Sequence, residues 1–173
     1  MRLRHFVPAT LLLTSVCTLA SAANEPLSLP ELAACAQHVE QLRTRSPELI
    51  ERNATHDQRR NDILTRRRAL DAQSMALGPD DLKGSLDLQI QRQALNKEAI
   101  ALNHEVQALR DEIAANSRVR DAYDQQCAQR PYPRSAFERL TANQQQAMRA
   151  GLSDILIPEL PRNLAPLAGV TPR

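Results

Sequence analysis

The sequence is poor in aromatic residues and in glycine. Its 173 residues include no tryptophan, two tyrosines, two phenylalanines and four glycines. A compact globular core usually draws on bulky aromatic side chains, so their scarcity beside abundant alanine, leucine and glutamine favours an elongated helical protein. The few glycines form no phosphate-cradling loop and no G-x-S-x-G elbow, which argues against nucleotide binding and serine-hydrolase chemistry.

An excess of charge of either sign is also missing from most of the chain. Residues 23–173 carry 20 Lys and Arg against 20 Asp and Glu, because Arg2 and Arg4 lie in the first 22 residues. Basic runs such as Arg66–Arg68 have acidic neighbours, here Asp62. A nucleic-acid-binding face needs a local positive excess, so we expect no nucleic-acid partner.

Long hydrophobic runs are confined to the start of the chain. Arg2 and Arg4, an apolar stretch over 6–19 and the small residues Ala20-Ser21-Ala22 are typical of a secretory signal peptide over residues 1–22. The stretch is too short to span a bilayer comfortably, so a retained anchor is the lesser alternative. We therefore predict an exported protein, periplasmic or alternatively secreted, with no integral membrane segment after cleavage.

Two cysteines remain after that cleavage, Cys35 and Cys127. They are equally distant from the helix-breaking sequence Gly78-Pro79-Asp80-Asp81, since their residue numbers add up to 162. An even pair of cysteines in an exported chain predicts one disulfide, and no third or fourth ligand lies close enough in sequence to favour a metal site. The symmetry predicts a long helical hairpin whose open end is closed by the disulfide.

Apolar residues recur every three or four positions on both sides of the breaker. This predicts an antiparallel coiled-coil hairpin over residues 31–129 with its tip at 78–81, after an extended segment over 23–30. When facing residues add up to 162, every a position meets a d position, as Leu49 meets Ile113. Each arm of about 45 residues would be roughly 70 Å long.

The seam of this hairpin is partly polar. Arginine at a core position must extend its guanidinium to water, so the seam is weak and the disulfide is expected to contribute about 4–5 kcal/mol. The polar core positions are Asn53, Arg60, Arg67, Arg92 and Arg120.

Local signals predict how the helices begin and end. Ser46-Pro47-Glu48 is typical of a helix start, so we expect a kink or a short interruption within the first arm. Gly78 is expected to end the first helix in a left-handed conformation, and Asp80 or Asp81 to cap the second.

The chain beyond Cys127 is richer in proline, and residues 130–162 predict a short helical appendage. Ser135 can begin one helix, and a capping box from Thr141 to Gln144 begins another that ends at Gly151. Residues 163–173 predict a disordered tail. An apolar cluster must be buried, either on the open end of the hairpin or in a protein partner: Leu152, Ile155, Leu156, Ile157 and Leu160.

Residues that carry chemistry do not converge in this pattern. His38, His56 and His104 lack the spacing of a helix-borne metal pair, so we expect no metal, no cofactor and no catalytic residue. The pattern favours a non-catalytic interaction or scaffold protein that binds an unidentified protein through the hairpin tip or the apolar cluster. Apolar residues off the seam could also seat a third helix or a homodimer: Ile50, Leu64, Leu86, Ile90 and Ile100.

Leu140-Thr141-Ala142-Asn143-Gln144 resembles the L-T-x-x-Q motif of the Spy/CpxP family of small periplasmic stress chaperones and sensors. The resemblance covers five residues, and the motif occurs once here, whereas the family repeats it. It implies long hairpin helices and, as the alternative function, a holdase chaperone or envelope-stress sensor. Binding of unfolded chains would require a contiguous apolar concavity built from the five off-seam residues.

Overall fold

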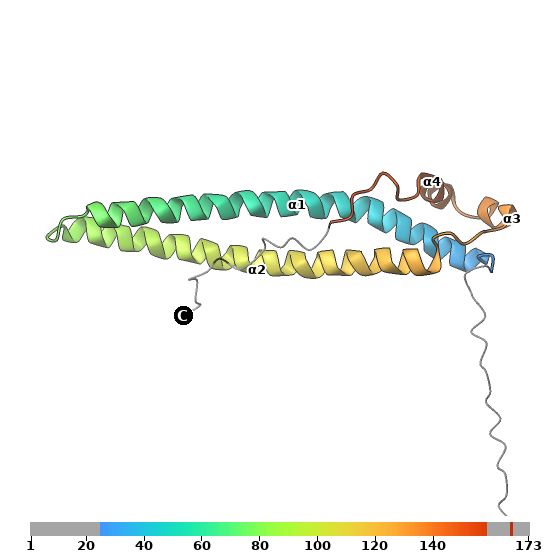
Figure 1. Cartoon of the computed structure of the whole chain (residues 1–173), viewed down its shortest axis with the longest axis horizontal. Helices are drawn as coiled ribbons and strands as arrows, with labels where there is room; N and C mark the ends of the chain where they lie inside the picture. The colour runs from blue at the N-terminus through green and yellow to red at the C-terminus, as the bar shows by residue number, and fades with distance from the viewer. Residues whose placement is uncertain (1–24, 159–166, 168–173) are drawn as a thin grey trace, which may run out of the picture.

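The computed structural model describes residues 25–158 and residue 167. These residues form α1 (Leu29–Ala76), α2 (Leu82–Gln126), α3 (Arg134–Glu138) and α4 (Ala142–Ala150). Figure 1 shows α1 and α2 side by side as a long hairpin, with α3 and α4 at the end away from the tip. A disulfide joins Cys35 to Cys127, so the predicted all-α hairpin closed by one disulfide is confirmed. The predicted signal peptide lies outside the described residues.

The first helix begins at Leu29, slightly before the predicted boundary of the hairpin. The Glu31 carboxylate accepts hydrogen bonds from the Ser28 hydroxyl and from the Ser28 N–H, the latter at 2.8 Å. The hydrogen bonds from Ser28 lower the pKa of the Glu31 carboxyl. Pro30 is tolerated in this first turn because its missing N–H would have no helical partner there.

The turn at the tip differs from the expected one on its first side. The prediction of a left-handed cap at Gly78 is wrong, because Gly78 has no positive φ. Pro79 restricts the residue before it to extended backbone, and Leu77 is already extended at φ −68° and ψ 135°. On the second side the Asp81 carboxylate accepts a hydrogen bond from the Gly84 N–H at 2.8 Å, as expected of a helix cap.

Pro47 lies inside α1, which continues through it without interruption. Figure 1 shows α1 bending in its cyan part. A proline in a helix removes one backbone donor and its ring clashes with the preceding turn, so it bends a helix that packing holds together. Of the two predicted outcomes, the structure has the bend and not the interruption.

The two arms pair in the predicted register. Leu49 and Ile113 are buried in one cluster, in agreement with the expected pairing. Asn116, which is also buried, donates from Nδ2 to the Ser46 Oγ at 3.0 Å, and the numbers of this pair again add up to 162. A slipped register would leave that buried amide without its partner, so the pair favours the observed alignment.

One flank of the hairpin carries a ladder of ion pairs between the arms. The Arg52 guanidinium donates to both oxygens of Glu112 at 2.7 and 2.9 Å, and Arg45 donates to the same carboxylate at 2.7 Å. The hydrogen bonds from Arg52 lower the pKa of the Glu112 carboxyl. The members of this Arg–Glu ladder recur every seven residues: Arg45, Arg52, Arg59 and Arg66 on α1, and Glu98, Glu105 and Glu112 on α2.

Candidate functional site

The predicted partner-binding cluster lies mostly against the hairpin. Leu152 is buried in an apolar cluster formed with α1, and Ile155 and Ile157 are partly buried on the same cluster. Leu156 is 79% exposed. Leu160 lies outside the described residues. Among the described members, only Leu156 presents most of its side chain to solvent, and a partner-binding role for the cluster stays a prediction.

A charged contact fixes this segment to the first arm. Arg43 donates to the two carboxylate oxygens of Asp154 at 2.7 and 2.9 Å and to the Gly151 carbonyl at 2.9 Å. Gly151 has a φ of +61°, a conformation that suits glycine because it has no Cβ. Two-point hydrogen bonding between a guanidinium and a carboxylate also fixes orientation. The segment after α4 is therefore held at one defined place on α1.

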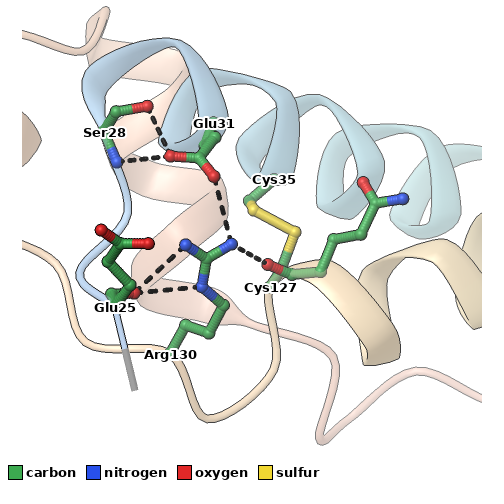
Figure 2. Close-up of polar contacts among 7 residues, drawn as sticks. Glu25, Ser28, Glu31, Cys35, Cys127 and Arg130 are labelled. Carbon is green, nitrogen blue, oxygen red and sulfur yellow. Dashed lines mark hydrogen bonds and ion pairs between the residues drawn. A yellow bond between two sulfur atoms is a disulfide. The ribbon is translucent and has the colours of Figure 1, made fainter. Parts of the chain in front are cut away.

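The open end of the hairpin is closed by polar contacts around the disulfide. Figure 2 shows the Arg130 guanidinium between Glu25 and Glu31, close to Cys35 and Cys127. Its Nε and Nη2 donate to the Glu25 carbonyl at 3.2 and 3.1 Å, and its Nη1 donates to the Glu31 carboxylate at 3.2 Å. These contacts join the segment before α1 to the segment after α2. The polar groups at this end of the hairpin are therefore engaged in holding the fold together.

Exposed apolar side chains gather near the tip instead. On α2, Leu82, Leu86 and Ile90 are 82, 57 and 55% exposed. Residues four apart share a helix face, so these three form one continuous stripe, here called the tip stripe. Met75 at the end of α1 is 83% exposed. Single exposed aliphatic residues are ordinary on a protein surface, whereas a stripe of them is typical of an interaction site.

A groove of about 900 Å³ lies between the arms next to the tip stripe. Arginine occupies two core positions that line it, Arg67 and Arg92, and a guanidinium that must reach water cannot fill an apolar seam. Arg92 donates to Asp71 on the other arm at 2.9 Å. Ligand clefts in proteins commonly have volumes of about 300–1,000 Å³, so the groove is large enough to hold part of another molecule.

A second, smaller cavity of about 380 Å³ lies beside His56 in the middle of the hairpin. The buried Nδ1 of His56 has no hydrogen-bond partner and lies 3.7 Å from the Glu105 carboxylate. Burial lowers the pKa of His56, although the Glu105 charge opposes this. His56 therefore lies on the seam, as its heptad position predicts, and its neutral form is the one that the fold favours.

Residues 25–158 and 167 contain no group of three or more His, Cys, Asp or Glu side chains that could hold a metal ion. Within the same residues, no helix combines the length and the apolarity that crossing a bilayer requires. Comparison of the chain with protein-family models, with curated proteins and with solved structures finds no match.

The sequence did not lead us to predict the groove or the Arg–Glu ladder. The ladder could have been found from the seven-residue spacing of arginine on one arm and glutamate on the other. The groove had a weaker signal, the two arginines at core positions near the tip, Arg67 and Arg92. Its shape depends on side chains from both arms and follows only from their packing.

Proposed function

We propose that the protein is an exported, non-catalytic interaction protein that binds a protein partner through the tip of its helical hairpin. The observation that supports this most directly is the tip stripe of Leu82, Leu86 and Ile90 beside the groove. The predicted signal peptide favours the periplasm, or secretion as the alternative. In this proposal the hairpin is a spacer that presents the tip at a distance from the disulfide-closed end.

Burial of the tip stripe would contribute part of the free energy of binding a partner. Each fully buried leucine or isoleucine side chain stabilises by roughly 1.5–3 kcal/mol, before the cost of association. Three such residues on one helix face fit a partner surface of similar width, such as the apolar side of another helix. The apolar cluster after α4 contributes less in this proposal, because Leu152 is already buried against α1.

The holdase alternative has less support. Its expected concavity would need Ile50 beside the off-seam residues of the tip, but Ile50 lies 26 residues before the end of α1, or about 39 Å along the helix. Leu64 is partly buried and packs against the core cluster of the tip half. Leu86 and Ile90 remain as neighbouring exposed residues, which suits a local contact better than the binding of a long unfolded chain.

The proposal is tested by capturing the partner with the full mature chain and with two substituted forms. We expect Leu86→Asp to lose a partner that the unsubstituted chain retains from an envelope extract of its source. Leu156→Asp is the comparison variant: Leu156 is similarly exposed but belongs to the apolar cluster after α4, so a loss of binding there alone would assign the partner to that cluster instead. The retained protein is identified by mass spectrometry, and its binding is then measured with purified components. Equal binding by all three forms would refute a role for the tip.

The same preparations separate the holdase alternative. We expect a stoichiometric amount of the chain to leave the aggregation of a reduced model substrate unchanged, as followed by light scattering. Suppression of aggregation that survives Leu86→Asp would favour the holdase over the proposed tip-binding function.

A further inference from the structure

One residue of the predicted tail, Leu167, packs on the hairpin. Leu167 falls in the predicted tail 163–173, but its side chain is only 3% exposed and belongs to an apolar cluster with Leu95 and Leu102. Its backbone N–H donates to the Asn103 Oδ1 at 3.0 Å. An apolar seam and a side-chain amide together hold Leu167, and the disorder of the tail stays a prediction. The rest of that predicted tail lies outside the described residues.

The pair of residue types that holds Leu167 recurs along α2 toward the tip. A buried leucine precedes an amide side chain at Leu102-Asn103, and again seven and fourteen residues earlier. Seven helical residues rise about 10.5 Å, which is close to the length of three residues of extended chain. The two further pairs line the groove: Leu95-Asn96 and Leu88-Gln89.

The charge on the groove selects among possible occupants. Among the lining residues, Arg92 donates to the single acidic one, Asp71, whereas Lys97 is an exposed cation. The residues of this chain that follow Leu167 include no acidic residue and one arginine, Arg173. Their side chains therefore offer no carboxylate to Lys97, whereas an acidic segment of another protein does.

From these observations we propose that the groove binds an extended acidic segment of the protein partner, with an aliphatic side chain at every third residue. The aliphatic side chains enter the seam beside Leu95 and Leu88, as Leu167 does beside Leu102. The Asn96 and Gln89 amides accept backbone N–H groups, as Asn103 does, and Lys97 faces the acidic residues. This inference rests on the proposed function and names the chemical class of the partner.

A short fluorescent peptide with leucine at every third position and acidic residues between them is the probe. We expect its fluorescence anisotropy to show saturable binding to the full mature chain at near-physiological salt. Loss of one hydrogen bond or reversal of one exposed charge costs about 1 kcal/mol, so Asn96→Ala and Lys97→Glu should each weaken binding about fivefold. Arg118→Glu is the matched control, since Arg118 is exposed on the same helix about 27 Å beyond the groove residue Ile100, and the Debye length is about 8 Å.

Each outcome bears on the inference. Saturable binding that is weakened by Asn96→Ala and Lys97→Glu, and unchanged by Arg118→Glu, would support it. Absence of binding, or equal binding by all variants, would overturn it, and partner capture that depends on Leu86 would still leave the proposed function intact. Binding only by a chain that ends after Leu167 would also overturn it, because this chain's own following residues would then be the occupant.

Discussion

Removal of the disulfide is the most direct test of how this hairpin is stabilised. The Cys35–Cys127 bond closes a loop with a sequence separation of 92 residues, which in the chain-entropy model corresponds to ~4.6 kcal/mol. Both side chains are buried in an apolar cluster, so the double variant Cys35→Ala and Cys127→Ala keeps the surroundings apolar. In a chain of 173 residues, 1 kcal/mol moves the Tm by about 2–4 °C, so we expect a fall of roughly 9–18 °C.

Circular dichroism of the helical signal during heating measures this fall. The single variant Cys35→Ala is the control: it loses the same bond, so its Tm should be close to that of the double variant. Unsubstituted protein melted with a reductant should lose stability by a similar amount. A double variant whose Tm stays within a few degrees of the unsubstituted protein would refute the reasoning. It would mean that packing along the seam, or association between chains, supplies the stability.

Three further predictions concern the seam and its flank. Ser46→Ala leaves the buried Asn116 amide unpaired and should cost about 1–3 kcal/mol in urea denaturation, whereas adding Asn116→Leu should recover most of it. Because burial lowers the pKa of His56, protonation opposes folding as the pH falls below about 6.5, the value in unfolded chains. His56→Leu should therefore gain Tm over the unsubstituted protein as the pH falls from 7 to 5, and a constant difference would contradict this. Glu112→Gln removes its pairing with Arg52, which is partly exposed, and should cost about 1 kcal/mol or less, a difference that should shrink in 1 M salt.

The hairpin fold and the register of its two arms could be predicted because two independent patterns agree on them. The cysteine spacing and the heptad positions both place Leu49 opposite Ile113, and each pattern follows from residue positions alone. The cap at Asp81 was predictable for a similar reason, since it depends on a few neighbouring residues. The left-handed cap at Gly78 failed because the conformation of Gly78 is decided by the proline that follows it.

The tip stripe and the groove were harder to predict from the sequence. Leu82, Leu86 and Ile90 are separated by four residues, but their exposure is known only once the arms have paired. Leu167 shows the limit more clearly, because a single residue outside any periodic element has no pattern that could mark it. Its burial depends on an amide about sixty residues earlier in the chain, Asn103, and on the apolar cluster that includes Leu95 and Leu102.

The position of the disulfide has a mechanical consequence. The first arm begins six residues before Cys35 and the second arm ends next to Cys127, so tension applied between the segments that directly flank the two cysteines passes through one covalent bond. The arms between the two cysteines are outside the path of that force and are not drawn apart by it. A pull on the base would therefore be transmitted without unzipping the helices, and the tip would keep its shape under load.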